Sequence, residues 1–248
     1  MVQAEADPSG AGWIGPQLLQ WWSLPDGSMP VGAVIPVGFE SYARVLHPPE
    51  QKGKRTPAGT RWAELAVRRG ATLRAETSWE DVAPQEGAEA SSLEPSEGHL
   101  PEREAGVLVE VLERWSSSSD DCWFGVWEGY GALDPDRRWP GAARLHLPSR
   151  DYVLLRGPVR AASRSFEPSP IHQSANLWWP QDRSWFVATE IDYAWTYVGG
   201  PAGCIQELLD DQRLETIAVR SEDRAVGRVA PSGPVRQQRL GISRLFRR

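Results

Sequence analysis

The order in which strand-like and helix-like segments follow one another constrains the fold of this chain most. Six short segments rich in β-branched and aromatic residues are predicted to be strands. They cover residues 31–37, 39–47, 122–127, 152–155, 184–193 and 216–219. Apolar residues at helical spacing predict three helices, at 61–69, 101–115 and 199–209. Strands and helices do not alternate, and no glycine-rich turn leads from a strand into a helix. We therefore predict an α+β fold with a mixed or mostly antiparallel sheet and a few packed helices.

Capping signals mark the ends of two predicted helices. Thr60 precedes the 61–69 helix and can accept a hydrogen bond from a first-turn amide, and Gly70 suits the left-handed conformation that ends a helix. Pro101 fits a first helical position, because the amide hydrogen that it lacks would have no partner there. These residues set the predicted helix boundaries.

Composition divides the chain into one folded body and regions without regular structure. Residues 1–12 are small and polar and are predicted to be disordered. Residues 13–220 are predicted to form a single α+β domain around one hydrophobic interior. Within it, apolar residues almost vanish at about 83–99, which predicts a flexible acidic segment. Residues 221–248 are predicted to form a basic, disordered tail.

The net charge of −6 conceals an asymmetry. Residues 220–248 contain eight arginines against two acids, a balance of +6, so the remaining residues 1–219 carry −12. An acidic body binds nucleic acid poorly, because phosphate neutralisation supplies most of that affinity. We predict no nucleic-acid partner for the folded body. The tail is expected to be solvated; contact with a polyanion or with the acidic body is the alternative.

Nothing in the sequence predicts export or a membrane. The N-terminus lacks a basic region followed by an apolar stretch, and no apolar run approaches the ~20 residues of a membrane span. Cys122 and Cys204 lie in apolar surroundings and are predicted to be buried and reduced, with a disulfide as the alternative. The predicted compartment is the cytoplasm. Arg outnumbers Lys 25 to 2, which is typical of a high-GC bacterial genome.

Several common catalytic motifs are absent from the sequence. It has no phosphate-binding loop, no dinucleotide fingerprint, no HExxH and no GxSxG. The four histidines, at positions 47, 99, 146 and 172, have no metal-ligand spacing, and two cysteines alone cannot build a structural zinc site. The sequence predicts neither a metal nor a cofactor.

Tryptophan is unusually frequent, with thirteen residues. Most lie on patterned segments and are expected to pack in the interior. Trp178 and Trp179 differ, because they follow Ser174-Ala175-Asn176 and precede Pro180 in a predicted loop. Packing is the simpler interpretation of this pair. Exposed rings would instead stack on a ligand or anchor a partner protein, and we name both as candidate binding residues.

Two carboxylates suggest a catalytic alternative. On the predicted 184–193 strand, Glu190 and Asp192 share a face about 6–7 Å apart. This separation is close to that of an inverting glycosidase pair, ~6.5–9.5 Å, and aromatic surroundings would raise one pKa. The simpler interpretations are two solvated acids, or a carboxylate held by a nearby arginine.

Four further residues near predicted turns or loops are considered: Glu128, Tyr130, Arg150 and His172. Glu128 follows a predicted strand and precedes the turn at Gly129-Tyr130-Gly131, so it is a candidate catalytic carboxylate, and Tyr130 is a candidate binding residue. Arg150 either binds an anion or forms an internal ion pair, and we favour the ion pair. His172 is expected to be solvated, although it lies near Ser174 and Asn176 and could join a nucleophilic set.

Four stretches of the chain, residues 35–48, 122–131 (CWFGVWEGYG), 176–200 and 204–209 (CIQELL), resemble a set of uncharacterised conserved proteins of high-GC actinobacteria. The resemblance covers most of residues 30–220. It implies no activity, because none is assigned to that set, and no functional residues can be carried over. The closing pattern, an aromatic strand followed by a small helix, is also similar to small immunity-type α+β domains of bacterial toxin systems.

Two hypotheses about function follow. The first is a non-catalytic protein-interaction or ligand-binding domain with an acidic, Trp-bearing surface, whose partner is a basic protein or a small molecule. The second is an enzyme of glycoside-hydrolase type that uses a carboxylate pair in a Trp-lined cleft. The sequence leaves the oligomeric state open.

Overall fold

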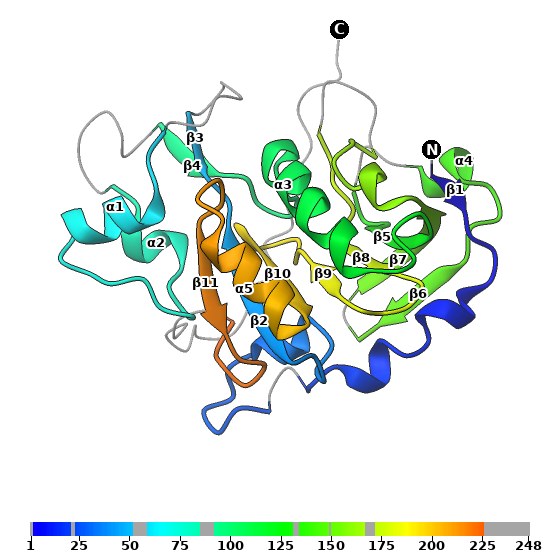
Figure 1. Ribbon diagram of the computed structural model, residues 1–248, viewed down its shortest axis with the longest axis horizontal. Coiled ribbons are helices and arrows are strands. Elements are labelled where there is room, and N and C mark those ends of the chain that lie inside the picture. The colour runs from blue at the N-terminus through cyan, green and yellow to red at the C-terminus, as the bar shows by residue number, and fades with distance from the viewer. Residues whose placement is uncertain are drawn as a thin grey trace, which may run out of the picture.

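The computed structural model describes residues 2–225 apart from 21–22, 52–58, 85–91, 131–133, 149 and 167–171. Over this part of the chain, helices pack against one long antiparallel sheet (Figure 1). Its nine described strands are β1 (Gln3–Ala4), β2 (Ser41–Leu46), β5 (Cys122–Trp127), β6 (Arg144–Leu147), β7 (Arg150–Gly157), β8 (Leu177–Pro180), β9 (Phe186–Ala188), β10 (Trp195–Gly200) and β11 (Thr216–Val219). The strand order is β1-β7-β5-β8-β9-β10-β2-β11, with β6 paired to β7. All of these pairings are antiparallel, which confirms the predicted α+β fold.

The helices lie beside this sheet. The described α-helices are α1 (Trp62–Arg68), α2 (Trp79–Val82), α3 (Glu102–Leu112), α4 (Pro135–Arg138) and α5 (Ala202–Asp210). Short 3-10 helices are η1 (Pro8–Ala11), η2 (Gly15–Gln17), η3 (Val31–Ala33), η4 (Glu113–Trp115) and η5 (Val159–Ala161). Strands β3 (Pro49–Gln51) and β4 (Leu93–Pro95) form a separate small ladder. The predicted helices at 61–69, 101–115 and 199–209 correspond to α1, α3 with η4, and α5.

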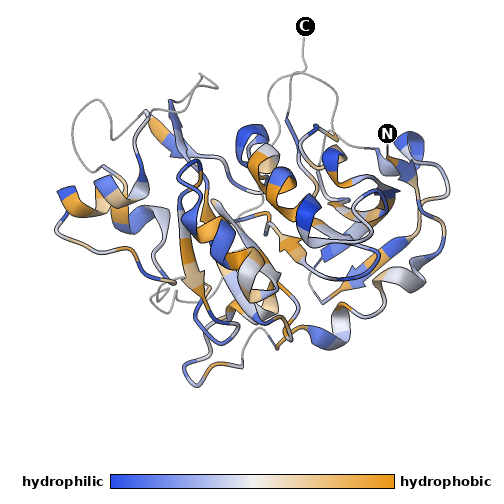
Figure 2. Cartoon of the chain, in the orientation of Figure 1, coloured by the Kyte–Doolittle hydropathy of each residue, from blue (hydrophilic) through white to orange (hydrophobic). Residues whose placement is uncertain are grey.

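The sheet is buried on both faces. Helices α3 and α5 cover one face, and Figure 2 shows hydrophobic residues alternating with hydrophilic ones along both helices. The N-terminal segment, α1 and α2 pack on the other face, where a second cluster forms around residues such as Ile14, Trp62 and Phe186. The prediction of one hydrophobic interior is therefore wrong, because the strands separate two clusters.

The N-terminus contradicts the prediction of disorder over residues 1–12, of which 2–12 are described. Gln3 and Ala4 pair with β7, and Ala11 is fully buried. Small residues are needed here because the Trp123 ring lies against Gly10, where an added Cβ would be 2.1 Å from the ring. The small residues that predicted disorder are thus the ones that permit this close packing.

Two strand predictions are wrong, one in the type of element and one in its extent. Residues 31–37 contain the 3-10 helix η3 instead of a strand. Of residues 184–193, only Phe186–Ala188 pair as β9; a turn follows, and β10 returns over Trp195–Gly200. Position 199 of β10 needs a glycine, because Phe39 packs against it and an added Cβ would be 2.7 Å from that ring.

Two predicted flexible segments are partly structured. In the acidic segment 83–99, β4 pairs with β3, and Gly98 adopts a φ of +75° against the Ile191 carbonyl; residues 85–91 lie outside the described residues. The predicted tail begins too early, because Ala225 is fully buried and its carbonyl accepts a hydrogen bond from the Tyr197 hydroxyl. Its remaining residues, 226–248, lie outside the described part of the chain.

The N-terminus of α1 is capped by Glu215, which lies in the connection between α5 and β11. Both Glu215 carboxylate oxygens accept hydrogen bonds from first-turn amides, at 2.8 Å from Trp62 N and 2.7 Å from Ala63 N. The predicted cap, Thr60, is not the N-cap residue; that position belongs to Arg61, which makes no side-chain capping bond. Gly70 does take the predicted left-handed conformation, with a φ of +66°.

We expect Glu215→Ala to lower the free energy of unfolding by about 1–2 kcal/mol, because it removes the partner of two helix amides. Thr60→Ala is the matched control and should change it by less than about 0.5 kcal/mol. Urea unfolding of both variants measures the difference. If both variants lost the same free energy of unfolding, the assignment of the α1 cap to Glu215 would be wrong.

Candidate functional site

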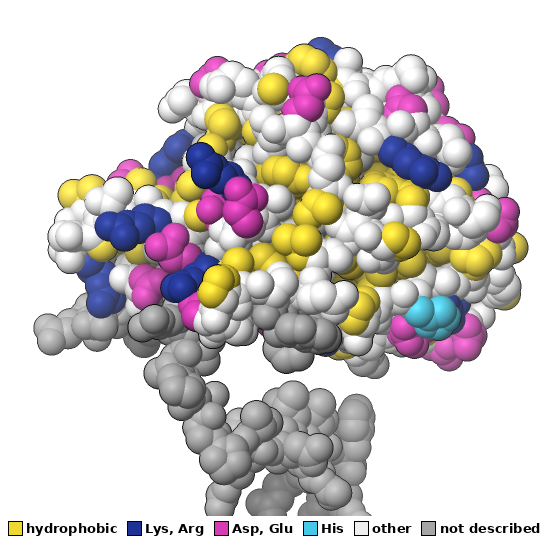
Figure 3. All heavy atoms as spheres, turned by 90° about the horizontal axis from the view of Figure 1, so that it is seen from below, with side chains coloured by type: hydrophobic (Ala, Val, Ile, Leu, Met, Phe, Trp, Pro, Cys, Tyr) yellow, Lys and Arg dark blue, Asp and Glu magenta, His cyan; other side chains and the backbone are white. Residues whose placement is uncertain are grey.

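A pocket of about 390 Å³ opens at one end of the sheet. Strand β7 begins there, β8 begins beside it, and the turn between β9 and β10 forms the adjoining wall. The N-terminal segment supplies the opposite wall. The lining residues are Gly15, Leu18, Leu19, Gln20, Met29, Ala33, Val34, Leu147, Pro148, Arg150, Tyr152, Leu177, Thr189, Glu190, Asp192 and Tyr193. The N-terminal segment runs along the lower edge of Figure 1, and Figure 3 shows hydrophobic side chains gathered between charged ones on that face.

Arg150 joins the two candidate carboxylates in this pocket. Its Nη2 atom lies 2.8 Å from Glu190 Oε1 and 3.1 Å from Asp192 Oδ2. The Glu190 side chain is 17% exposed and that of Asp192 is 73% exposed. The favoured prediction of an internal ion pair is thus correct for Arg150, whereas its neighbour Asp151 contacts His146 Nδ1. The arginine sits where β7 begins, and both acids lie on the β9–β10 turn.

The carboxylates do not have the geometry predicted for an inverting pair. Glu190 and Asp192 follow β9 on a turn instead of sharing the face of an extended strand. The two oxygens bound to Arg150 are within 3.1 Å of the same nitrogen, so they are closer to each other than ~6.5 Å. Burial raises the pKa of Glu190, and the charge of Arg150 opposes this rise.

Next to these acids lies a tyrosine hydroxyl that has no hydrogen-bond partner among the described residues. Tyr193 lines the pocket and is 7% exposed, and its ring stacks on Trp195 with 4.4 Å between centroids. Its buried hydroxyl makes no hydrogen bond with any residue that the structure describes. Burial raises the pKa of Tyr193, and nearby Tyr197 and Glu190 add to the rise. A buried hydroxyl without a partner costs about 1–3 kcal/mol, so it is a group for which a ligand atom would be favourable.

A buried chain of hydrogen bonds leads from the pocket wall into the protein. Thr189 Oγ1 lies 2.7 Å from Thr196 Oγ1, which lies 2.9 Å from Nε2 of His47. The other ring nitrogen, Nδ1, lies 2.6 Å from the Ser96 carbonyl. All three side chains are essentially inaccessible to solvent.

The polarity of this chain follows from its ends. Burial lowers the pKa of His47 to about 3, so the ring is neutral at pH 7. The Ser96 carbonyl can only accept, so Nδ1 carries the proton and Nε2 accepts from Thr196. The hydroxyl proton of Thr196 is then used, and Thr189 donates to it. Local sequence patterns do not reveal this chain of hydrogen bonds, because His47 lies 149 residues from Thr196.

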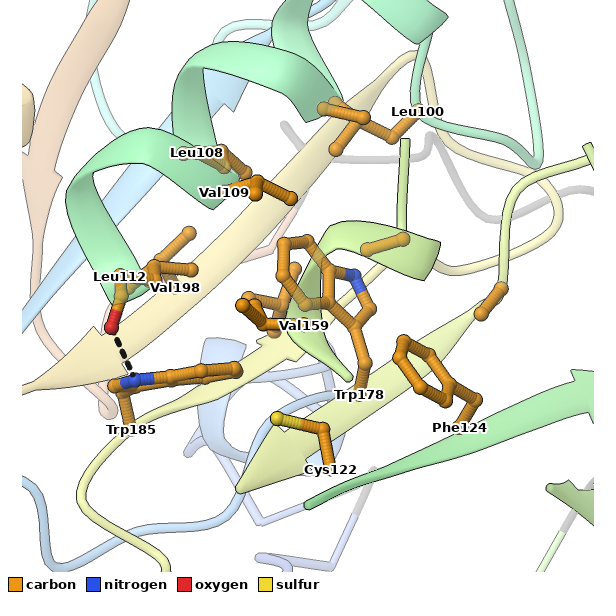
Figure 4. Packing of buried hydrophobic residues seen from close by; sticks show 14 of the residues in the cluster. Leu100, Leu108, Val109, Leu112, Cys122, Phe124, Val159, Trp178, Trp185 and Val198 are labelled. Carbon is orange, nitrogen blue, oxygen red and sulfur yellow. Dashed lines mark hydrogen bonds between the residues drawn. The ribbon is translucent and has the colours of Figure 1, made fainter. Parts of the chain in front are cut away.

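Trp178 and Trp179 are not exposed, which corrects their assignment as binding residues. They lie on β8 and are 1% and 0% exposed. Figure 4 shows Trp178 beneath α3, and its ring meets Trp185 edge to face at 5.5 Å. Trp185 Nε1 donates to the Leu112 carbonyl at 3.0 Å. Because both sheet faces are buried, two consecutive tryptophans pack into opposite clusters.

The remaining candidates lie outside this pocket. Glu128 accepts a hydrogen bond from Arg144 Nε at 2.8 Å and lines a neighbouring recess that shares Arg150 with the pocket. The Tyr130 hydroxyl donates to the Gly98 carbonyl at 2.7 Å and accepts from Asn176 Nδ2 at 2.9 Å. Burial raises the pKa of Tyr130 to about 12. Tyr130 therefore has a structural role in the fold, and its assignment as a binding residue is not supported.

Other chemistry is limited within the described residues. Cys122 and Cys204 are buried free thiols, and burial raises the pKa of each to about 12. His172 is partly buried and contacts the Leu100 carbonyl at 3.3 Å, instead of being fully solvated. No group of three or more His, Cys, Asp or Glu residues in the described ranges has the arrangement of a metal site. None of the described helices is long and apolar enough to span a bilayer.

The pocket therefore combines Arg150, Glu190 and Asp192, which the sequence singled out, with Thr189 and Tyr193, which it did not. Comparisons of this chain with protein-family models, with curated proteins and with solved structures give no match, so its function is inferred from the geometry of this pocket.

Proposed function

We propose that the chain binds a small, mostly apolar molecule with a neutral hydrogen-bonding head in the pocket at the β9–β10 turn. The observation that carries the proposal is the convergence of Arg150, Glu190 and Asp192 on one wall of an otherwise largely apolar pocket. A volume of about 390 Å³ is within the ~300–1,000 Å³ typical of small-molecule sites.

The apolar walls favour a ligand body without charge. Leu18, Leu19, Met29, Val34 and Leu177 line the pocket. Burial of apolar ligand surface contributes roughly 25 cal/mol for each Å² removed from water. Most of the affinity would come from this contact, and the polar wall would fix the orientation of the ligand.

The polar wall favours a neutral head such as a hydroxyl or an amide. Arg150 already pairs with two carboxylates, so an added anion would meet Glu190 and Asp192, and an added cation would meet the guanidinium. A hydroxyl or amide can both donate and accept. The Tyr193 hydroxyl, which has no hydrogen-bond partner among the described residues, has both capacities, and Thr189, which donates its hydroxyl proton to Thr196, can only accept.

The two hypotheses from the sequence have less support. A Trp-bearing interaction surface relied on exposure of Trp178 and Trp179, and both are buried. A glycosidase cleft relied on tryptophan walls and a widely spaced carboxylate pair. The described lining residues include no tryptophan, and the oxygens of Glu190 and Asp192 that bind Arg150 are too close for the inverting arrangement.

Four probes with one ring and different heads test the proposal: benzyl alcohol, benzamide, benzoate and benzylammonium. We expect the two neutral probes to bind in this pocket with Kd on the order of 1 mM, because they are small. Protein-observed NMR titration measures the affinities and locates the shifts. Ala33→Phe should fill the pocket and weaken binding of the neutral probes at least tenfold. Val67→Phe adds the same ring at a 75% exposed position and should change nothing.

Tyr193→Phe separates a ligand-binding role of the hydroxyl from a structural one. Removing a buried hydroxyl that has no partner within the described part of the chain should leave the free energy of unfolding unchanged or slightly higher. The same change should weaken binding of the neutral probes several-fold. Absence of binding by benzyl alcohol and benzamide, or equal binding to wild type and Ala33→Phe, would refute the proposed function.

A further inference from the structure

A second pocket, of about 200 Å³, lies where α4 approaches β1, at the end of the sheet where the two elements stand side by side in Figure 1. Its walls come from the end of α4, from η5 and the segment after it, and from the residue before β1. The lining residues are Val2, Arg138, Trp139, Pro158, Arg160, Ala161, Arg164, Ser165 and Phe166. It shares no residue with the pocket at the β9–β10 turn.

The charge of this pocket is opposite to that of the body. Three arginines line it, and no acid is among its described lining residues. Residues 1–219 together carry −12, since the chain has a net charge of −6 and residues 220–248 carry +6. Three guanidinium groups around one small pocket on an acidic protein create a local site for an anion.

The three guanidinium groups differ in how they are held. Arg138 Nε donates to the Phe166 carbonyl at 2.9 Å, and its guanidinium lies 5.3 Å from the centre of the Trp139 ring. Arg160 pairs with Asp120 at 2.9 Å. Arg164 makes neither an ion pair nor a side-chain hydrogen bond with the residues that the structure describes. One arginine is thus positioned by the fold, and another is available to a ligand.

The floor of the pocket is apolar. Trp139, Ala161 and Phe166 are 8%, 7% and 3% exposed, and all three belong to the hydrophobic cluster beneath. A guanidinium binds a carboxylate through two parallel N–H···O bonds. An apolar floor below a basic rim therefore matches a molecule with a carboxylate on a small apolar body.

We propose that this pocket is a binding site for a small organic carboxylate, with the carboxylate between Arg138 and Arg164 and the apolar body against Trp139 and Phe166. The site is independent of the proposed function, because the two pockets differ in both residues and ligand charge.

Titration with benzoate, with inorganic phosphate and with benzyl alcohol tests this site by protein-observed NMR. We expect benzoate to shift the resonances around Trp139 and Phe166, with phosphate at least fivefold weaker because it gains nothing from the floor. Arg164→Glu should weaken benzoate binding roughly tenfold. Its folding should be unaffected, because the Arg164 side chain has no ion pair or side-chain hydrogen bond to lose among the described residues. Benzyl alcohol should not shift these resonances.

Arg220→Glu is the matched control, because it makes the same charge reversal at an exposed position at the end of β11. Benzoate affinity should be unchanged in this variant. An equal loss in both variants would show general attraction to positive charge and overturn the site, as would absence of benzoate binding. Phosphate binding as strong as benzoate would overturn the carboxylate assignment. Failure of benzyl alcohol at the β9–β10 pocket would refute only the proposed function.

Discussion

Replacing Trp179 by alanine is expected to lower the free energy of unfolding by about 3–5 kcal/mol. The Trp179 indole is fully buried in the middle of a three-ring stack. Its ring lies 5.9 Å from that of Trp123, at 6° between planes, and 5.3 Å from that of Phe186, at 15°. Alanine would remove both ring contacts and leave a cavity between Trp123 and Phe186. Urea unfolding followed by circular dichroism measures the loss.

Trp179→Phe is the matched control for this prediction. Phenylalanine keeps a ring in the stack, and it removes an indole Nε1 that is buried without a hydrogen-bond partner among the described residues. The expected loss is therefore only about 1 kcal/mol. If Trp179→Ala unfolded at nearly the same urea concentration as wild type, the Trp179 ring would not be in the core. That result would support the alternative hypothesis that Trp179 is an exposed recognition residue.

The same residue shows where sequence patterns fail in this fold. Alternation of apolar and polar residues identifies a strand with one buried face. Residues 39–47 predict a strand because they divide between two faces, and residues 122–127 predict one because they form an aromatic run. In β8, Trp178 and Trp179 are adjacent and Pro180 follows, which resembles a loop with a hydrophobic patch. When both faces of a sheet are covered, adjacent side chains both enter the interior and alternation disappears.

The pocket could be predicted only in part, for a related reason. Glu190 and Asp192 were identified as a pair from their spacing, but their partner, Arg150, is forty residues earlier in the chain. The hairpin register that brings them together depends on β10, which was missed because Gly199 and Gly200 resemble the start of a turn. The local pattern therefore identified the polar residues of the site but not their arrangement.

The buried His47 is expected to make the stability of the protein depend on pH below neutrality. Burial lowers its pKa from 6.5 to about 3, and the nearby charges of His99 and Arg44 act in the same direction. The folded state prefers the neutral ring. The contribution of His47 to the free energy of unfolding is therefore complete above pH 6.5 and is lost progressively as the pH falls toward 3. The expected loss from this residue is on the order of 1 kcal/mol for each pH unit in that window.

A comparison with His47→Gln isolates this effect, because every other titrating group is present in both proteins. At pH 7 the variant should be less stable, since it disrupts the bonds to Ser96 and Thr196. As the pH falls from 7 to 4, the difference between wild type and variant should narrow by about 2 kcal/mol or more, because only wild type must protonate a buried ring.

Thr196→Val separates the titration from the hydrogen bonds. This variant loses the hydroxyl that links His47 to Thr189 but keeps the imidazole buried, so its free energy of unfolding should fall with decreasing pH as steeply as that of wild type. Urea unfolding at four pH values between 7 and 4 gives all three slopes. Parallel pH dependence in wild type and His47→Gln would show that the ring is not held neutral. Thr189 could then no longer be restricted to accepting hydrogen bonds, because the polarity of the chain depends on the neutral ring.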